Sequence, residues 1–252
     1  MINIKPIQKI LSYTRKAVCD YDMISEGDKI AVGVSGGKDS LTLLCALNEL
    51  RRFYPKRFEL VPITVDMGFP NASSDNIKEL CDTLGLKLHL IPSEIYKIVF
   101  EIRKEKNPCS LCANLRRGAL NEAALELGCK KVALAHHFDD AVETFYLNLF
   151  NEGRIACFSP VSFLDRREIT VIRPFIYVSE KEIKHFIRVS GVQPSPKYCP
   201  SDGNTDRQKV KDLLAELSKK DRGLKQRLFG AMERAGVSGF RVCPRYMRKK
   251  SN

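Results

Sequence analysis

Residues Ser35 to Ser40, Ser-Gly-Gly-Lys-Asp-Ser, combine the residue types that bind phosphate groups. They lie between an apolar run, Ile30 to Val34, and a stretch whose apolar residues recur at helical spacing, so the sequence predicts a strand, a tight turn and a helix. The first N–H groups of a helix have no partner within it, and glycines let the backbone close around an anion. Lys38 adds a positive charge, and Ser35 and Ser40 add hydroxyl groups. We expect Asp39 to contact a bound Mg²⁺.

The spacing of Gly36, Gly37 and Lys38 excludes the P-loop of ordinary NTPases, which requires four residues between its first Gly and its Gly-Lys-Ser/Thr. The motif resembles instead the PP-loop of ATP pyrophosphatases, enzymes that hold pyrophosphate while AMP is transferred to a carbonyl oxygen. This resemblance implies that residues 35–40 bind ATP and that the reaction is an adenylation. The alternative is a glycine turn that joins strand to helix and binds no ligand.

A second group of residues suited to chemistry is formed by Cys109 and Cys112, at the start of a predicted helix. Their spacing allows two thiolates to hold one metal ion or cluster, but it is also typical of a redox dithiol. Cys199 lies in a proline-rich loop that can fold back over the edge of the sheet, and it is the candidate third ligand. The other cysteines lie mostly in apolar helical surroundings and are expected to be core thiols: Cys19, Cys45, Cys81, Cys129, Cys157 and Cys243.

Polar residues also follow two further predicted strands. His136, His137, Asp139 and Asp140 come directly after a strand that ends at residue 135, and Asp66 ends another strand. Because ligands bind at the carboxyl ends of parallel strands, we expect Asp66 and His136 near the nucleotide, and the histidines and carboxylates suit phosphate or Mg²⁺ contacts or proton transfer. The alternatives are a turn-starting Asp66, an N-cap at Asp139 or Asp140, and a histidine bonded to backbone at the helix start.

The elements that must position these residues alternate between strands and helices. Strands are predicted at residues 30–34, 58–66, 87–91, 130–135 and 169–174, with helices between them and at residues 4–26, 179–191 and 208–235. This alternation predicts an α/β fold, a doubly wound parallel sheet of Rossmann-like type with its first strand central and helical additions at both ends. We expect an N-terminal helical extension (1–26), a PP-loop ATP pyrophosphatase domain (27–192), and a cysteine loop with a basic helical region (193–252).

Composition and charge narrow the class of protein. Of the 252 residues, 44% are hydrophobic, and no apolar run approaches the length of a membrane span. The first ten residues lack a signal-peptide pattern, so we expect a cytoplasmic protein. Nine cysteines without an export signal indicate reduced thiols and a metal or redox centre, not a disulfide framework.

The formal net charge of +12 is concentrated near the C-terminus. From Arg207 onward there are 14 Lys and Arg residues against 4 Asp and Glu residues. Such a segment is typical of a protein that binds a polyanion, and nucleic acid is the leading candidate. The alternative is a solvated helix face with a basic tail.

Taken together, the motifs resemble the tRNA 2-thiocytidine synthetase (TtcA) family from about residue 5 to residue 237. The motifs that carry the resemblance are Ser35 to Ser40, Pro-Cys-Ser-Leu-Cys-x-x-Leu-Arg-Arg-Gly from Pro108, His-His-x-Asp-Asp from His136 with Thr144 and Leu147-Asn148, Ile172-Arg173-Pro174, and Cys199. The resemblance implies ATP-dependent replacement of the C2 oxygen of a tRNA cytidine, cytidine 32, by sulfur. It also implies a [4Fe-4S] cluster held by Cys109, Cys112 and Cys199, with one iron free to hold sulfide.

The same resemblance guides the remaining expectations. Lys38 and Mg²⁺ are expected to spread the charge that develops during adenylation, and Asp140 to polarise or deprotonate the base. Arg116, four residues after Cys112 and so on the same helix face, is expected to steady the cluster sulfide or the AMP phosphate. The expected partners are tRNA at the basic C-terminal region, a cysteine desulfurase or sulfide as sulfur source, and a second copy of the chain in a homodimer.

The sequence also departs from the family pattern. Pro196 stands where the family often has a further cysteine, Pro200 follows Cys199 in place of the usual glycine, and the loop after Asp66 differs from the common pattern. Three alternatives therefore stay open. They are another PP-loop tRNA enzyme that thiolates uridine or attaches lysine, a cluster-free enzyme with a persulfide on Cys109 or Cys199, and a nucleotide-sensing domain stapled by zinc.

Overall fold

Six strands form a single sheet in the computed structural model, which describes residues 2–3, 5–104, 108–196, 198–199 and 206–242. The strand order is β3-β2-β1-β4-β6-β5, and every pair is parallel except β5 with β6. The strands are β1 Asp28–Gly33, β2 Phe58–Asp66, β3 His89–Pro92, β4 Lys131–Ala133, β5 Val161–Leu164 and β6 Ile169–Ile172. The predicted doubly wound sheet with an inner first strand is confirmed, whereas the antiparallel edge strand β5 was not predicted.

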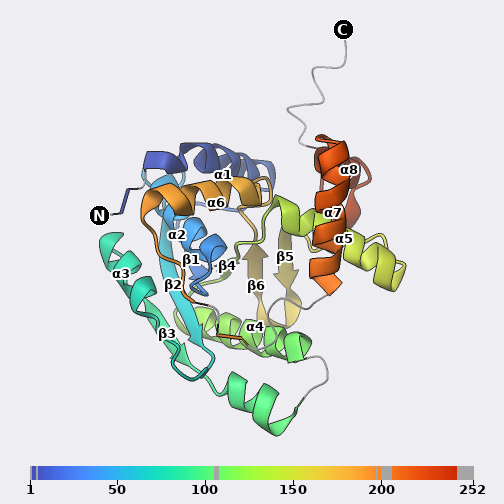
Figure 1. Ribbon diagram of the computed structural model, residues 1–252. Helices are drawn as coiled ribbons and strands as arrows, with labels where there is room; N and C mark the ends of the chain where they lie inside the picture. Colours follow the sequence, from blue (N-terminus) through green and yellow to red (C-terminus); the bar gives the residue numbers. More distant parts are fainter. Residues whose placement is uncertain (1, 4, 105–107, 197, 200–205, 243–252) are drawn as a thin grey trace.

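Helices cover the sheet and extend beyond it (Figure 1). The α-helices are α1 Gln8–Asp20, α2 Lys38–Leu50, α3 Asp75–Thr83, α4 Pro108–Glu126, α5 Phe138–Glu152, α6 Glu180–Ser190, α7 Asp206–Lys220 and α8 Leu224–Arg234. A π-helix, η2, spans Lys97–Ile102, and short 3₁₀ turns occur at η1 Lys5–Ile7, η3 Asp165–Arg167 and η4 Val237–Gly239. Within the described ranges, no helix combines the length and apolar character needed to cross a bilayer.

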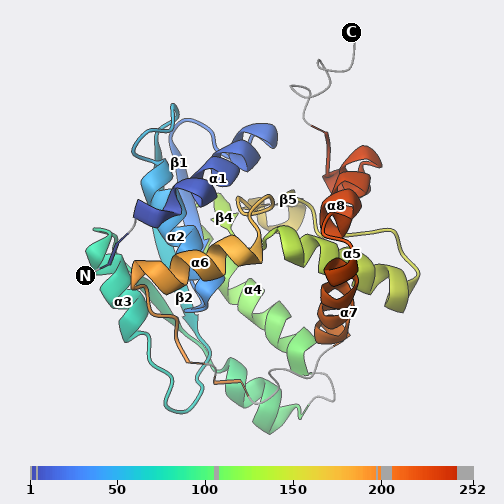
Figure 2. The same ribbon diagram turned by 45° about the horizontal axis from the view of Figure 1, so that its top comes forward.

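The central strand β1 is buried on both faces because its successive side chains point to opposite sides of the sheet. Ile30 and Val32 belong to one buried cluster, together with residues of α1, α2, α3 and α6. Ala31 belongs to a second cluster, which contains Leu120 and Ala124 of α4. The two views in Figures 1 and 2 show α1, α2 and α6 together on one side of the sheet and α4 apart from them. A parallel sheet covered in this way positions its strand ends rigidly.

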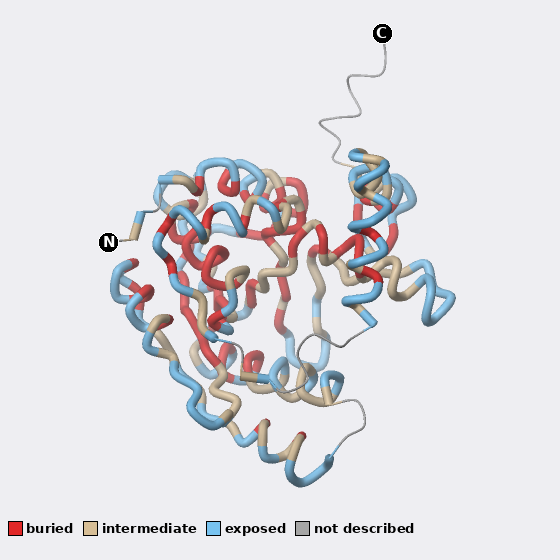
Figure 3. Tube along the Cα trace, viewed as in Figure 1, coloured by how far each residue is buried: buried red, intermediate tan, exposed pale blue. Residues whose placement is uncertain are grey.

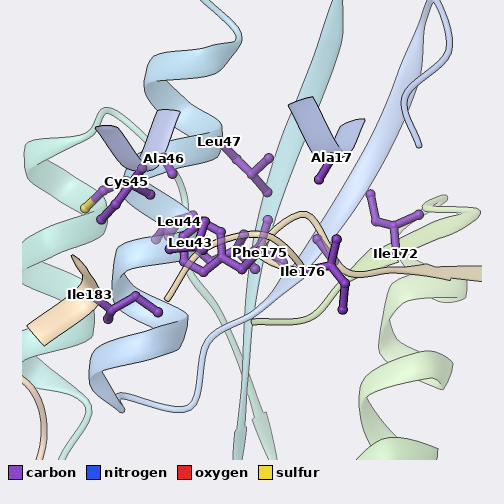
Figure 4. Packing of buried hydrophobic residues seen from close by; sticks show 14 of the residues in the cluster. Ala17, Leu43, Leu44, Cys45, Ala46, Leu47, Ile172, Phe175, Ile176 and Ile183 are labelled. Carbon is purple, nitrogen blue, oxygen red and sulfur yellow. The ribbon is translucent and has the colours of Figure 1, made fainter. Parts of the chain in front are cut away.

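Helix α2 lies in the middle of the larger cluster, so the turn before it is held firmly. Leu43, Leu44 and Leu47 are fully buried, and they pack near Phe175 and Ile183 (Figure 4). A helix buried on most sides has little polar face, and from Leu43 to Leu47 every residue of α2 is apolar. The later turns of α2 pack in the core, and this packing anchors the N-terminus of the helix.

The C-terminal helices pack on α5, beside the sheet (Figure 2). Phe229 of α8 packs against Phe138 of α5 with ring centroids 4.8 Å apart, and Leu214 of α7 is fully buried. Buried and exposed stretches alternate along the C-terminal helices (Figure 3). The helical character predicted for residues 208–235 is confirmed, but the structure divides this range into two helices, α7 and α8. There Gly223 interrupts the helix and donates its N–H to the Asp221 carboxylate (3.1 Å).

Candidate functional site

Three parallel strands bring the sequence-predicted polar residues to one edge of the sheet. β1 lies between β2 and β4, and the chain leaves β1 and β4 in opposite directions, to α2 and α5. Ligands bind at such a switch point because the helix N-termini and the strand ends create a crevice there. Residues 35–40, which we call the cradle, follow β1, and residues 136–140 follow β4.

The cradle is organised by hydrogen bonds within its own six residues. The Ser40 hydroxyl accepts the N–H of Ser35 (3.1 Å) and donates to the Gly37 carbonyl (3.0 Å). Gly36 has φ of +77°, in the left-handed region that favours glycine, and Gly37 is the N-cap of α2. The turn is thus fixed in shape before any ligand binds, with first-turn N–H groups of α2 available to an anion.

A strap made of residues 193–196 crosses the cradle from the far end of the chain. Ser195 donates its N–H to the Gly36 carbonyl (2.9 Å) and its hydroxyl to Asn76 Oδ1 (3.0 Å), while Asn76 donates to the Gln193 carbonyl (2.7 Å). A Cβ atom on Gly36 would collide with the Ser195 side chain, lying 2.9 Å from its Cβ. Gly36 is therefore required both by its backbone angle and by the close approach of the strap.

Charged groups around the cradle are paired. The Lys38 ammonium lies 2.9 Å from Asp39 and 3.2 Å from Glu180 of α6. Burial opposes the charge of Lys38, but the two carboxylates outweigh it and raise the pKa of this lysine. Burial likewise opposes ionisation of Glu180, yet Lys211, Lys184 and Lys38 together lower its pKa to about 2. Lys38 is thus held in place within the cradle by two carboxylates, and it remains charged.

Asp39 is the cradle residue with an unused acceptor. Its Oδ2 binds Lys38, whereas its buried Oδ1 has no hydrogen-bond partner among the described residues, with His137 Nε2 at 3.7 Å. A buried carboxylate oxygen without a partner is costly, and oxygen is the ligand that Mg²⁺ prefers. Asp39 therefore fits a magnesium contact.

His137 and Asp140 cap the start of α5. The Asp140 N–H donates to His137 Nδ1 (3.2 Å), and the His137 N–H donates to Asp140 Oδ2 (2.9 Å). The N-cap is thus His137, and neither Asp139 nor Asp140 occupies that position. Asp139 instead accepts the Glu180 N–H (2.8 Å) and binds Lys225 of α8 (2.6 Å). The second carboxylate oxygen of Asp140, Oδ1, takes no part in this capping.

Sequence reasoning missed Arg207, which reaches the site from α7. Its guanidinium lies 3.4 Å from Asp140 Oδ1 and donates to the Thr144 hydroxyl (2.9 Å). The sequence marks Arg207 only as the first cation of the basic C-terminal segment. No local pattern distinguishes it from the other cations there, because its role depends on how α7 packs on α5.

A cavity of about 430 Å³ joins most of the predicted site residues. Those that line it are Ser35, Gly37, Asp39, Ser40, Arg116, His136 and Asp140. Its apolar wall comes from β2 and α4, including Ile63, Val65 and Leu120. The predicted residues Gly36, Lys38 and Asp66 are not part of this lining. The cavity has room for a small planar group beside the cradle, with a carboxylate, an imidazole and a guanidinium around it.

His136 is held neutral in this cavity. Burial, with the positive charges of Arg173 and Arg207, lowers the pKa of His136 to about 3. Its ring packs on Phe158 with centroids 4.9 Å apart, and its Nδ1 has no hydrogen-bond partner within the described part of the chain. A neutral imidazole can both donate and accept, so His136 is able to recognise a ligand group by hydrogen bonding at physiological pH.

The three candidate metal ligands lie at one rim of the site. Cys109 and Cys199 are exposed and Cys112 is partly buried, whereas Cys45, Cys81 and Cys129 are buried in the core. Burial raises the pKa of Cys112, Arg116 opposes this shift, and the neighbouring thiols of Cys199 and Cys109 add to it. The three thiols are thus close enough to affect one another, and the next turn of α4 carries Arg116, which lines the cavity. Cys243 lies outside the described residues.

Thiolate is the ligand type that iron–sulfur clusters require, so the donor set fits such a cluster. Within the ranges that the structure describes, however, no three His, Cys, Asp or Glu side chains already form a group that could hold a metal ion. To share one metal group, Cys109, Cys112 and Cys199 would have to turn toward a common centre. The segment around Cys199 and the first turn of α4 are the elements that would have to adjust.

Asp66 lies at the carboxyl end of β2 but faces another part of the surface. Its Oδ1 accepts the Gly68 N–H (3.0 Å), as expected of an aspartate that starts a turn. It lines a separate cavity with Lys78 and Lys87. Its contact with a nucleotide stays a prediction.

Comparisons with known proteins agree with this geometry. A family model described as a PP-loop domain matches residues 7–212. A tRNA-cytidine(32) 2-sulfurtransferase of Syntrophotalea carbinolica is 42% identical over 89% of this chain and 88% of its own. A tRNA-cytidine(32) 2-sulfurtransferase of Pelobacter propionicus is 46% identical over 80% of this chain and 76% of its own.

Among solved structures, the fold is similar to that of the U34-tRNA thiolase NcsA from Methanococcus maripaludis with its [4Fe-4S] cluster. The TM-score is 0.72 at 25% sequence identity, and the match covers 90% of this chain and 78% of that chain.

Proposed function

The chain belongs to the PP-loop family of tRNA-cytidine(32) 2-sulfurtransferases, and on that premise we propose that it exchanges the C2 oxygen of a tRNA cytidine for sulfur with ATP. The observation that carries the proposal is the cavity at the switch between β1 and β4. There an anion-binding cradle, a carboxylate, a neutral imidazole and a guanidinium converge on one space. The rim of that space carries three thiols.

The cradle binds the phosphates of ATP in this proposal. Gly36, Gly37 and the first turn of α2 supply N–H groups, Ser35 and Ser40 supply hydroxyls, and Lys38 supplies a charge that turns from Glu180 toward phosphate. Asp39 has the free buried oxygen that suits Mg²⁺. The C2 oxygen of the base attacks the α-phosphorus, pyrophosphate leaves, and the oxygen becomes part of an AMP leaving group.

The base lies between β4 and α4. Asp140 polarises or deprotonates it, and Arg207 keeps that carboxylate oriented from α7. His136 forms a hydrogen bond with the base as a neutral imidazole, since its pKa is lowered to about 3 by burial and neighbouring arginines. Arg116 faces both the cavity and Cys112, where it steadies the AMP phosphate or the incoming sulfur.

Cys109, Cys112 and Cys199 hold an iron–sulfur cluster in this proposal. A cluster held there would keep an exogenous sulfide close to the activated C2 carbon, so that a C–S bond would form as the C–O bond to the AMP leaving group breaks. Arg116 partly offsets the effect of burial on the Cys112 thiol, which favours the thiolate that a metal ligand needs. Residues 193–196 connect the cradle to Cys199 through Ser195.

The partners follow from this chemistry. The substrate is tRNA, and the basic C-terminal helices α7 and α8 contribute to its binding. A cysteine desulfurase or free sulfide supplies the sulfur, and a second copy of the chain completes a homodimer. In this proposal residues 1–26 are a helical extension, residues 27–192 are the PP-loop domain with the nucleotide site and two of the thiols, and residues 193–252 supply Cys199 and the basic helical region for tRNA.

The decisive experiment is reconstitution without oxygen, followed by reaction with unmodified tRNA, ATP and sulfide. We expect equal amounts of iron and acid-labile sulfide in the protein, AMP and pyrophosphate formed only with tRNA, and 2-thiocytidine in the digested tRNA by mass spectrometry. A colourless protein that binds zinc would instead support a stapled nucleotide sensor. Thiouridine in place of thiocytidine would reassign the base, and activity without iron would support persulfide chemistry.

The role of Asp140 has its own test. Asp140→Asn keeps the size of the side chain and its capping of α5, and is expected to lower kcat by about 10²-fold with an unchanged dissociation constant for ATP. Arg116→Ala is expected to lower the thiolation rate as well. Full thiolation rates in both variants would remove these two residues from the mechanism.

A further inference from the structure

A second cleft, of about 460 Å³, lies between α4 and the β5–η3 segment at the antiparallel edge of the sheet. Its polar and aromatic lining consists of Asn114, Arg117, Asn121, Phe163, Asp165, Arg166 and Arg167. Asn114, Arg117 and Asn121 recur every three or four residues and so lie on one face of α4. None of the motifs that predicted the active site includes β5 or η3, so the role of this cleft is unassigned.

The cleft carries more positive charge than its surroundings neutralise. One carboxylate, Asp165, accompanies the three arginines in the lining, and across the described residues none of the three arginines forms an ion pair. Arg167 donates only to the Gly118 carbonyl, at 3.4 Å. Guanidinium groups that are exposed and not engaged by carboxylates are suited to bind phosphate.

The C-terminal helices present a different arrangement. Arg207 is paired with Asp140, Lys211 with Glu180, and Lys225 with Asp139. These ion pairs hold α7 and α8 against α5 and α6. Fewer cations of the basic C-terminal segment are therefore available to bind a polyanion than its composition indicates. The three arginines of the α4 cleft, in contrast, form no ion pair among the described residues.

Two further side chains in the cleft lack partners. The Phe163 side chain is 60% exposed, although a phenylalanine gains most from burial. Asn121 is 3% exposed, and its Oδ1 has no hydrogen-bond partner among the described residues. An exposed ring offers a surface on which a nucleobase can stack, and a buried amide oxygen without a partner can accept a hydrogen bond from a ligand.

The cleft is continuous with the active site through one residue. Arg117 lines both this cleft and the cavity that contains Asp140 and the cradle. A group bound in the cleft therefore lies next to a base bound in the cavity. A nucleic acid strand presents that combination, since a phosphodiester separates each base from the next.

We propose that the cleft between α4 and β5–η3 binds the nucleotide adjacent to the target base of the RNA substrate. Arg117, Arg166 and Arg167 bind the flanking phosphates, the base stacks on Phe163, and Asn121 accepts a hydrogen bond from it. This inference rests on the proposed function, because it assumes that an RNA base occupies the cavity.

The test compares two charge reversals of equal size. In the full chain, Arg166→Glu with Arg167→Glu changes the cleft, and Lys5→Glu with Arg15→Glu changes exposed cations on η1 and α1, which pack in the buried cluster that does not contain α4. We expect the cleft variant to bind unmodified tRNA about tenfold more weakly or worse, and the slope of log affinity against log salt to flatten by about 1.5. The control pair is expected to change the affinity less than about threefold. Equal losses in both variants, or none in the cleft variant, would overturn the inference.

Phe163→Leu tests stacking without a change of charge. Because the ring is mostly exposed, its loss leaves the core intact, and the free energy of unfolding serves to check this. We expect this variant to lose affinity for tRNA by about fivefold or more, whereas Phe163→Tyr keeps the wild-type affinity. An unchanged affinity in Phe163→Leu, or competition for the cleft by an acidic peptide but not by RNA, would contradict the assignment.

The same preparations separate this inference from the proposed function. If the wild-type protein forms no thiolated nucleoside, the proposed function fails. If the wild-type protein thiolates tRNA, and the variants at positions 163, 166 and 167 bind and thiolate it equally well, only the cleft assignment fails.

Discussion

The candidate active site has two halves, the cradle and the thiol rim, which consists of Cys109, Cys112 and Cys199. Contacts within the chain fix the shape of the cradle but not that of the thiol rim. In the cradle, Ser40 holds the turn from Ser35 to Gly37 with two hydrogen bonds, and the buried helix α2 anchors it. At the rim, Cys109 and Cys199 are exposed, and no three donor side chains within the described residues already form a metal-binding group. The proposed nucleotide site is preorganised, while the proposed thiol site would be completed by its ligand.

This difference reflects the physical origin of each half. The cradle arises from residues adjacent in sequence at a single strand-to-helix connection, so local geometry suffices to shape it. The rim combines α4 with a loop more than 80 residues later in the chain, and a cluster supplies the bonds that would fix these parts together. The strap through Ser195 links the two halves, because it binds the Gly36 carbonyl four residues before Cys199.

Gly36→Ala is expected to have the largest effect, because it disturbs both halves. The added methyl group lies in the left-handed region and collides with Ser195, at a combined cost of about 2 to 4 kcal/mol. ATP binding, measured by calorimetry, and iron retention after reconstitution should both be lost or strongly reduced.

The matched control is Gly37→Ala. Gly37 has φ of −72°, and a Cβ there meets only Ser35 Oγ at 3.6 Å, an ordinary contact. This variant should keep the wild-type free energy of unfolding and iron content. A Gly36→Ala protein that retains iron normally would show that the strap does not connect the two halves.

Replacing single cysteines should separate the halves. Cys109→Ser, Cys112→Ser and Cys199→Ser are each expected to lose iron and acid-labile sulfide after anaerobic reconstitution, with ATP affinity within about twofold of wild type, because the cradle is built independently. Cys19→Ser, on α1, is the control and should keep its iron. Full iron content in any of the three variants would exclude that cysteine as a ligand.

Glu143 is a buried carboxyl on α5, close to Asp140. We expect it to lower the free energy of unfolding at high pH. It is 3% exposed, its Oε1 lacks a hydrogen-bond partner among the described residues, and burial with the charge of Asp140 raises its pKa from 4.5 to about 7. Between these two values the folded state holds a proton that the unfolded state has lost, so stability falls as the pH rises through this window.

Glu143→Gln removes that penalty. The variant should therefore exceed wild type in free energy of unfolding by about 2 kcal/mol at pH 8, and the gain should shrink toward zero as the pH falls to 4.5. Urea unfolding at several pH values measures both. A gain that does not depend on pH would show that the carboxyl does not titrate in this way.

The smallest effect is expected at Arg207, which supports the nucleotide half from α7. Arg207→Ala should lower kcat about tenfold and leave ATP affinity unchanged, because it removes the partner of Asp140 and Thr144 and no contact with the cradle. The control is Arg227→Ala on α8, which breaks an exposed ion pair with Asp221. Equal rates for wild type and Arg207→Ala would show that Asp140 needs no support from the C-terminal helices.

Much of this architecture was predictable because it depends on short-range patterns. The strand before the cradle, the glycine turn and helix α2 follow from adjacent residues, and the strand and helix around His136 follow in the same way. The four-residue strand β5 was not predictable, because its identity depends on pairing with β6 and one of its residues, Phe163, is mostly exposed. The break at Gly223 was missed because a single glycine is often tolerated within a helical pattern.

The sequence by itself determined the anion-binding turn, the parallel α/β sheet, and the candidate residues Lys38, Asp140 and Cys109. Tertiary structure alone decided which distant residues join them: Ser195 over Gly36, Arg207 beside Asp140, and Arg117 between the active site and a second cleft. The physical reason is that backbone conformation and capping act over a few residues, whereas contacts between distant segments depend on how buried faces pack. A cation that binds phosphate and a cation that pairs with a carboxylate look alike in the sequence, and only the folded chain distinguishes them.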